Sequence, residues 1–100
     1  MNYHLSVRPE VLTDLAEAEA WYESQQIGLG RDFLREVRTK LIFLQDYPTL
    51  ARVRHRRYHV RWVYPRRFPY RIVYRITSGT VVVYGVIHAA RHDREWRRRI

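Results

Sequence analysis

The side chains that could do chemistry in this sequence are arginines and histidines, and most of them lie in its second half. Residues 1–50 hold five basic and eight acidic side chains, a net charge of −3, whereas residues 51–100 hold fourteen arginines and two acids, a net charge of +12. A guanidinium group binds phosphate and stays protonated, so it can stabilise negative charge but makes a poor general base. His59 is the best candidate for proton transfer, because imidazole has a reference pKa of about 6.5.

This uneven distribution of charge predicts an acidic partner. The formal net charge of the chain is +9, and Lys40 is its only lysine. A bias in genomic base composition would favour arginine over lysine, but it would not gather the arginines in one half of the chain. The partner is therefore expected to be nucleic acid, an anionic protein segment, or both.

Metal and thiol chemistry are disfavoured by the same sequence. It contains no cysteine, which excludes disulfides and thiolate ligands. His55 and His59, like His88 and His92, are four residues apart, a spacing that suits metal binding on a helix. The first pair lies in strand-like sequence, however, and few carboxylates are near. We therefore expect neither a metal nor another cofactor.

Composition limits the kind of protein that this sequence encodes. A hydrophobic fraction of 46%, with 14% aromatic residues, excludes a disordered chain, and 100 residues suit a single domain over residues 1–100. No apolar run approaches the ~20 residues of a membrane-spanning helix. The first residues lack the pattern of a signal peptide, so we expect a cytoplasmic protein with no membrane partner.

A strand pair is predicted at the centre of the fold that must position these side chains. Residues 70–76 follow the period-2 pattern of a half-buried strand, and residues 80–87 form a second run rich in valine. Thr77, Ser78 and Gly79 lie between the two runs and supply the chemistry of a turn. We expect an antiparallel hairpin in the middle of a sheet.

Two helices are predicted before this hairpin. After a short strand over residues 2–7, a helix is expected over about 9–26, with one apolar stripe. Gly28 and Gly30 end this helix and allow a tight turn into a second one. The second helix has its own apolar stripe and ends before Pro48. The stripes are Val11, Leu15, Ala18 and Tyr22, then Phe33, Leu34, Val37, Leu41 and Leu44. The two helices should pack as an antiparallel hairpin on the sheet.

A further strand and a short tail complete the predicted fold. Aromatic and valine residues alternate with others near residues 58–64, and Pro65 ends that run. After His88 the tail should be a short helix or irregular, with Trp96 docking it. The prediction is an α+β fold with an N-terminal strand, an antiparallel helical hairpin and then a three-stranded antiparallel sheet segment.

One face of this sheet is expected to gather the basic side chains. If the even-numbered residues of 70–76 pack under the helices, Arg71 and Arg75 point the other way. If the even-numbered residues of the neighbouring strand also point inward, His59 and Arg61 share that outer face. The predicted basic face comprises Arg61, Arg71 and Arg75 with His59, and Arg91, His92 and Arg94 at its rim. The alternative is that these are ordinary charged positions on the solvent side or edge of an antiparallel sheet.

The order of these motifs resembles the RelE/ParE superfamily, the toxins of bacterial type II toxin–antitoxin systems. The resemblance covers nearly the whole chain and is carried by the combination of motifs rather than by any one of them. It rests on Asp14-Leu15, Ala18, Trp21-Tyr22-Glu23, Gly28-Leu29-Gly30, Phe33-Leu34, Val37, Phe68-Pro69-Tyr70-Arg71-Ile72-Val73-Tyr74 and Val86-Ile87-His88. It implies a growth-arresting toxin that a cognate antitoxin neutralises.

The RNA-cleaving branch of that superfamily implies a ribosome-dependent mRNA endonuclease with basic catalytic residues. Its paired lysines fall here on His59 and Arg61, which is a departure from the pattern. Its strand arginine is retained as Arg71, and its tail arginine falls on Arg91 or, with a shift of one residue, on His92. On this resemblance the candidate catalytic residues are His59, Arg61, Arg71 and Arg91, and the set is only partly present.

The ParE-like branch implies a toxin that binds DNA gyrase and carries no catalytic set, and the resemblance favours it somewhat. Trp96 stands in for the late aromatic residue of the nucleases and cannot exchange a proton as tyrosine does. The implied partners are gyrase and an antitoxin whose acidic segment covers the basic half. Arg61, Arg71, Arg75, Arg91 and Arg94 are then binding residues. A nucleic-acid-binding module without toxicity is the remaining alternative.

Overall fold

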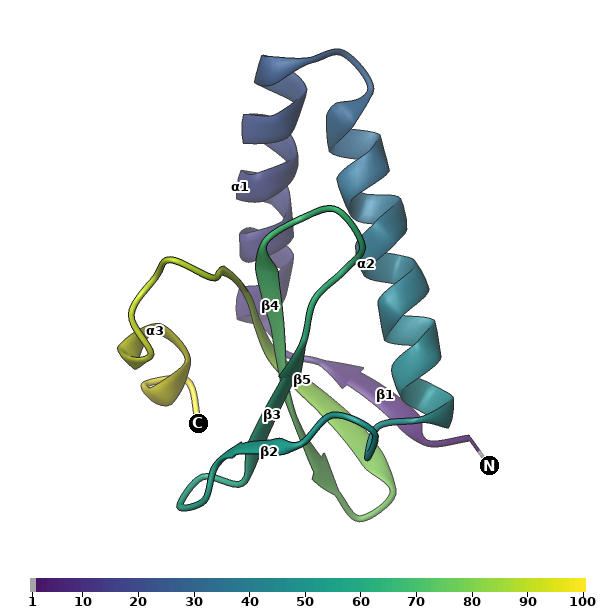
Figure 1. Cartoon of the computed structure of the whole chain (residues 1–100), viewed down its shortest axis with the longest axis vertical. Coiled ribbons are helices and arrows are strands. Elements are labelled where there is room, and N and C mark those ends of the chain that lie inside the picture. The colour runs from purple at the N-terminus through teal and green to yellow at the C-terminus, as the bar shows by residue number, and fades with distance from the viewer. Residues whose placement is uncertain (1) are drawn as a thin grey trace.

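The strand pair predicted from residues 70–87 forms the middle of a five-stranded sheet. The structure, a computed structural model, describes residues 2–100. β4 (Tyr70–Thr77) and β5 (Thr80–His88) pair antiparallel across a turn in which Ser78 and Gly79 have positive φ angles of 48° and 75°. In the strand order β1-β5-β4-β3-β2 they lie second and third, and the α+β class is confirmed (Figure 1).

Both edges of the sheet differ in part from the prediction. β1 (His4–Val7) pairs with β5 in parallel, so the sheet is mixed. The chain passes through both helices and three strands between β1 and β5, so no tight turn imposes antiparallel pairing. At the other edge β2 (Val53–His55) pairs with β3 (Val60–Val63), and residues 56–59 form the turn between them. Three residues are too few to show alternation, which is why the sequence predicted a single strand over 58–64.

The helical hairpin agrees with the prediction to within a few residues. α1 (Pro9–Gln25) and α2 (Leu29–Asp46) lie side by side above the sheet (Figure 1). Gly28 between them has a φ of 89°, a left-handed conformation that glycine adopts without strain. The Glu23 carboxylate accepts hydrogen bonds from the Gly28 and Gly30 N–H groups at 2.9 and 3.0 Å, so it satisfies donors at the start of α2.

The helices and one face of the sheet enclose the main hydrophobic core. Val11 and Phe33 from the helices meet Ile72 and Tyr74 from β4, and all four are fully buried. The Tyr74 hydroxyl donates to the Pro48 carbonyl at 2.6 Å, which satisfies the one polar group that this ring brings inside. Packed aromatic rings extend the core between the helices and the sheet, namely Tyr22, Phe33, Phe68 and Tyr70.

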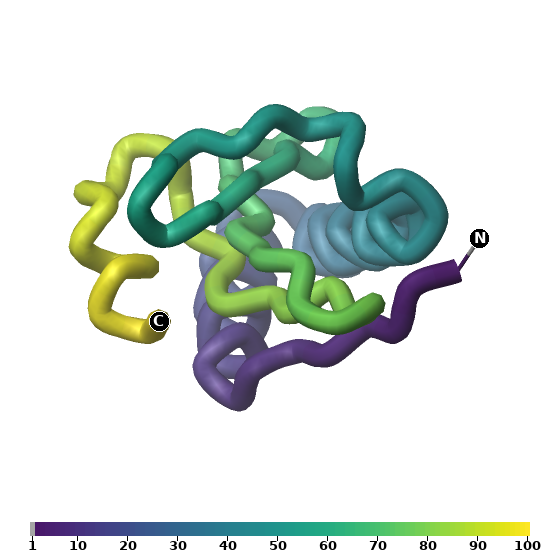
Figure 2. Tube along the Cα trace, turned by 90° about the horizontal axis from the view of Figure 1, so that it is seen from below, coloured from purple at the N-terminus to yellow at the C-terminus, as the bar shows by residue number. Residues whose placement is uncertain are grey.

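A second, smaller cluster covers the opposite face of the sheet. Trp96 of α3 (Arg94–Arg97) is 1% exposed and packs with Val60, Val73 and Ile87. The predicted docking of the tail by Trp96 is therefore confirmed. Figure 2 shows the tail lying against the sheet, beside the turn that follows β2. We call this side, which Trp96 covers, the tail-side face.

The tail-side cluster reverses the predicted orientation of β3. Val60 and Trp62 point toward Trp96 and not toward the helices, so the expectation that the even-numbered residues of this strand face inward is wrong. The prediction assumed one buried face, because only the helices were expected to cover the sheet. Here the tail buries the other face as well, and apolar β3 side chains find their partners there.

Candidate functional site

Arg71 lies on the tail-side face with its charge already paired. Its guanidinium carbon lies 4.7 Å from the centre of the Trp62 ring, and Nη1 lies 3.2 Å from the Asp93 carboxylate. The side chain is 20% exposed. Alternation along β4 places the half-buried Arg75 on the same face, as the sequence predicted. Asp93 neutralises the charge of Arg71 and would compete with a phosphate for it.

Arg61 lies on the helix side of the sheet and has a structural role. Its Nη1 donates to the carbonyl oxygens of Thr49 and Ala51 at 3.1 and 2.8 Å. In the ladder it lies opposite Tyr74, whose ring is in the main core. The expectation that Arg61 shares a face with Arg71 is therefore wrong, for the same reason that Val60 and Trp62 are reversed. The arginine ties the loop after α2 to the sheet.

His59 lies in the turn between β2 and β3, not on a strand as expected. It is exposed and has a φ of 54°, which few residues other than glycine adopt. Because the residue lies outside the β ladder, no strand register aligns it with Arg71. The structure therefore does not bring together the imidazole and the arginines that a phosphate-cleaving site would need.

The arginines predicted at the rim of the basic face lie exposed in the tail, apart from Arg61 and Arg71. Arg91 is exposed in the segment after β5, and Arg94 is exposed on α3. The neighbouring histidines make local bonds, because Nδ1 of His88 accepts the Ala90 N–H at 3.0 Å and Nδ1 of His92 accepts that of Arg94 at 3.1 Å. The five arginines of the predicted basic face are thus divided among the tail-side face, the loop after α2, and the tail.

His55, which the sequence singled out only by its spacing from His59, faces the tail-side cluster together with Tyr58. The His55 ring lies 4.9 Å from the Tyr58 ring and 5.8 Å from that of Trp96, measured between centroids. These rings pack on one another, and the residue pattern around them gave no sign of this contact. Within residues 2–100, no group of three histidine, aspartate or glutamate side chains could hold a metal ion.

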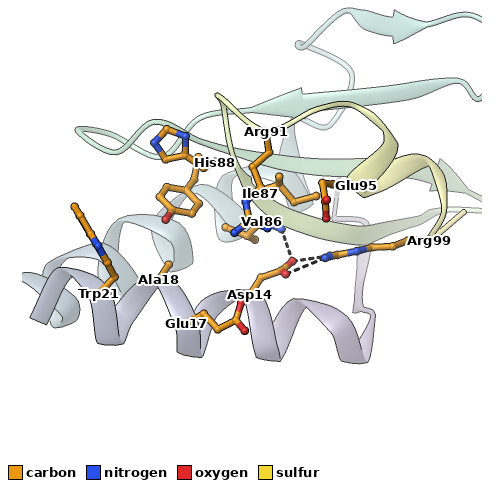
Figure 3. Close-up of a pocket in the computed structure, with 11 residues that line it drawn as sticks. Asp14, Glu17, Ala18, Trp21, Val86, Ile87, His88, Arg91, Glu95 and Arg99 are labelled. Atoms are coloured by element: carbon orange, nitrogen blue, oxygen red, sulfur yellow. Dashed lines mark hydrogen bonds and ion pairs between the residues drawn. The ribbon is translucent and has the colours of Figure 1, made fainter. Parts of the chain in front are cut away.

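A groove opens where α1 passes the end of β5 (Figure 3). It has a volume of about 200 Å³ beside Asp14 and about 520 Å³ toward Pro69. Trp21 is 57% exposed, and its side chain lines the groove together with Arg91. Burial raises the pKa of the Tyr70 hydroxyl, which also lines the groove, so this site favours the protonated phenol. Aromatic walls beside a guanidinium suit a segment that carries both apolar and acidic side chains.

An ion pair beside the groove ties the tail to α1. Arg99 binds Asp14 with both of its terminal nitrogens, at 2.7 and 3.1 Å, and one of them also donates to the Tyr84 carbonyl at 3.1 Å. The Asp14 carboxylate accepts the Val86 N–H at 3.0 Å as well. In the sequence, Asp14 stood out only among the residues that carry the family resemblance, with no partner for its carboxylate. No local pattern links residues that are 85 positions apart.

This geometry is suited to binding anions and proteins more than to moving protons. The carbonyls of the loop after α2 hold Arg61, and Asp93 holds Arg71. Trp96 is buried and its indole N–H can only donate. Charge stabilisation by a free, positioned cation next to a proton acceptor is the usual requirement for phosphate cleavage. The predicted catalytic residues His59, Arg61 and Arg71 do not form that pair on one face.

Sequence comparison assigns the chain to a family. A family model described as the ParE toxin of the type II toxin–antitoxin system parDE matches residues 5–93. The chain belongs to the ParE toxin family. No curated protein sequence matches this toxin, and no helix within residues 2–100 is long and apolar enough to cross a membrane.

Solved structures share the fold of this toxin. A chain of the chromosomal ParDE toxin–antitoxin system from P. aeruginosa aligns with a TM-score of 0.67 at 15% identity, over 86% of this chain and 95% of that one. The toxin RelE from E. coli, solved as a mutant in the free state, aligns with a TM-score of 0.75 at 21% identity, over 100% and 99%. The predicted RelE/ParE resemblance is confirmed, and at these identities the two structures support the fold alone.

Proposed function

We propose that this ParE-family toxin arrests bacterial growth by binding DNA gyrase in the cytoplasm. The observation that carries the proposal is the dispersal of the basic residues that an RNA-cleaving toxin would need. Arg61 binds loop carbonyls, Arg71 is paired with Asp93, and His59 lies in an exposed turn. A toxin that acts by binding needs no such catalytic set, and its arginines can instead hold loops or contact partners.

The toxin's antitoxin is expected to be acidic where it touches the toxin. The second half of the chain carries a net charge of +12, and Arg91 lines the aromatic groove beside Trp21. A segment with glutamate or aspartate next to a large apolar residue would satisfy both features. Arg71, Arg75 and Arg94 lie farther along the same half and would extend the contact for a longer acidic segment.

Two activity assays run side by side test the proposed target. Purified toxin is added to a gyrase supercoiling reaction and to a translation reaction in which cleavage of ribosome-bound mRNA is followed. Inhibited supercoiling with intact mRNA is the expected result. Codon-positioned cleavage of the message with unaffected supercoiling would overturn the proposal.

The variant His59→Ala sharpens the test. If the toxin binds gyrase, no single side chain carries chemistry, and this variant should arrest growth about as well as the wild type. If the toxin cleaves mRNA, loss of its best candidate for proton transfer should slow cleavage by roughly 10²–10⁴-fold. Trp96→Ala is unsuited to this purpose, because removing a buried ring would unfold the tail.

A ribosome-dependent endonuclease is the second candidate function. The observation in its favour is the retention of Arg71, the strand arginine of the nuclease pattern, on the tail-side face. Arg71 would then stabilise the phosphate after release from Asp93, with Arg91 approaching from the tail. Arg71→Gln would lower the cleavage rate by roughly 10²–10³-fold if that were the function, and would leave gyrase inhibition unchanged if it were not.

A further inference from the structure

The hairpin formed by β2, β3 and the turn between them carries a separate cationic surface. Four exposed arginines lie in β2, just before it and in the turn after it, whereas Arg61 of β3 is half-buried. The exposed Arg97 of α3 lies 6.0 Å from the ring of Tyr58 in that turn. We name this set the arginine hairpin, comprising Arg52, Arg54, Arg56, Arg57 and Arg97. None of the five forms an ion pair with a carboxylate of residues 2–100. Both acidic side chains of the second half are paired with other arginines, Asp93 with Arg71 and Glu95 with Arg98.

Aromatic rings hold three of these guanidinium groups in place. Arg54 lies 5.2 Å from the Trp62 ring centre, Arg57 lies 5.7 Å from that of Tyr58, and Arg97 lies 6.0 Å from the same tyrosine. The tyrosine in turn packs on the buried Trp96 at 5.9 Å. A cation that rests on a ring keeps its charge and loses rotamer freedom before any ligand arrives. The surface is therefore preorganised for an anion, which lowers the entropic cost of binding.

The surface lacks the anchors that a protein partner would need. The large apolar side chains that are exposed lie on β1, the helices, the loops and the last residue, and none lies between residues 52 and 61. Protein interfaces draw their affinity from a few buried apolar or aromatic anchors. A surface of unpaired arginines alone suits a polyanion, whose binding is dominated by phosphate contacts and release of counterions.

The arrangement of this surface suits the backbone of a DNA duplex. β2 is the edge strand of the sheet, so the arginines of β2 and of the turn that follows it lie at one border of the molecule, beside the tail (Figure 2). Duplex DNA carries one phosphate charge per about 1.7 Å of helix axis, which gives a dense row of anions for such a group of cations. We propose that the arginine hairpin binds the phosphate backbone of duplex DNA, and that it does so beside the DNA that gyrase holds.

The proposed binding of DNA does not depend on the proposed function. The proposal that this binding occurs beside gyrase rests on that function. If the helical side binds gyrase and the arginine hairpin binds DNA, the toxin contacts the enzyme and its DNA at the same time. The helical side, which exposes the apolar residues, would face the protein. The arginine hairpin would face the nucleic acid.

The test is a salt titration of DNA binding. Fluorescence anisotropy of a labelled duplex of about 20 base pairs is followed with purified toxin between about 50 and 200 mM salt. Neutralising four phosphates gives a slope of about −3.6 in log affinity against log salt, or a loss of roughly 150-fold over this range. A slope near zero, or no binding at the lowest salt, overturns the proposal.

Charge-matched variants locate the contact. Arg56→Gln with Arg57→Gln removes two charges from the exposed turn and should lower the slope to about −1.8. Arg31→Gln with Arg38→Gln removes two exposed charges from α2 and should leave the slope nearly unchanged. Equal losses in the two variants would mean that net charge alone drives binding, which would overturn the assignment to the hairpin. Thermal unfolding of both variants checks that they fold.

Two further measurements compare DNA with other ligands and test DNA binding independently of gyrase binding. Duplex RNA of the same sequence should bind more weakly than DNA, because the grooves of an A-form helix differ in width and depth from those of B-form DNA. Equal binding, or tighter binding of a glutamate-rich peptide, overturns the choice of DNA. Gyrase capture is then measured without DNA. Capture that persists in the Arg56→Gln, Arg57→Gln variant, with weaker inhibition of supercoiling, supports both proposals. Capture without any DNA binding by the wild type would refute this inference alone, and DNA binding without capture would refute the gyrase target alone.

Discussion

Breaking the ion pair between Asp14 and Arg99 should destabilise the toxin far more than breaking an exposed pair. Both side chains are largely buried, at 11% and 15% exposed. Asp14→Ala leaves the Arg99 guanidinium without its carboxylate and the Val86 N–H without its acceptor. Removing one partner of a buried pair costs about 3–5 kcal/mol. Since small domains are stable by about 5–15 kcal/mol, this change would remove a large share of the free energy of unfolding.

The control for this variant is the pair between Arg98 and Glu95 on α3. Its N···O distance of 3.0 Å is similar to that of the buried pair, but the arginine side chain is 69% exposed. An exposed pair contributes about 0–1 kcal/mol, so Arg98→Ala should change stability very little.

Urea unfolding followed by tryptophan fluorescence measures both variants. The double variant of Asp14→Ala and Arg99→Ala should show a coupling energy of about 0.5–3 kcal/mol between the two positions. If Asp14→Ala costs no more than Arg98→Ala, the bonds that join the tail to α1 do not hold the fold together, and the argument from burial fails.

Other predictions concern the core, the helical hairpin, alkaline stability and the antitoxin. Ile72→Ala should cost about 2–5 kcal/mol in urea unfolding, because the side chain is fully buried in the main core; a loss below about 1 kcal/mol would contradict its assignment. Gly30→Ala should cost about 1–3 kcal/mol, because its Cβ would lie 2.7 Å from the Glu19 carbonyl oxygen of α1, and Thr39→Ala on the exposed face is the matched control. Burial raises the pKa of Tyr74 to about 12, so folding favours the protonated phenol, and stability should fall as the pH rises from about 10 to that value. Tyr74→Phe should flatten this alkaline loss, and an unchanged pH profile would speak against burial as its cause. The association rate of the antitoxin's acidic segment should fall steeply with salt, and a flat dependence would exclude the basic half as its docking surface.

The sequence predicted correctly those helices and strands that show a regular residue pattern within their own length. The period of 3.6 residues located α1 and α2, and Gly28 marked the break between them. The alternation in residues 70–76 located β4 and assigned Ile72 and Tyr74 to the helix side correctly, because the helices cover that face and bury every second residue. The mixed character of the sheet was not predictable in this way, since β1 and β5 are brought together by tertiary packing.

The candidate site was predicted less well than the fold, because its geometry depends on the tail. Nothing in the sequence indicated that Trp96 would bury the second face of the sheet. Val60 and Trp62 were therefore predicted to point toward the helices. That single assumption moved Arg61 onto the wrong face. Arg71 and Arg75 were placed correctly because β4 has unambiguous alternation, whereas the pairing of Arg71 with Asp93 depends on a contact across 22 residues.

The parallel pairing of β1 with β5 has a consequence for how this toxin is made in the cell. His4 lies opposite Thr80 in the ladder, so the first strand has no partner until 76 more residues have been synthesised. At about 5–20 residues per second, translation leaves β1 waiting for roughly 4–15 s. Pairings so distant in sequence also slow folding, because the loop between them must close first. A newly made toxin therefore passes through an interval in which its sheet cannot be complete, and an antitoxin already present in the cell has that interval in which to reach it.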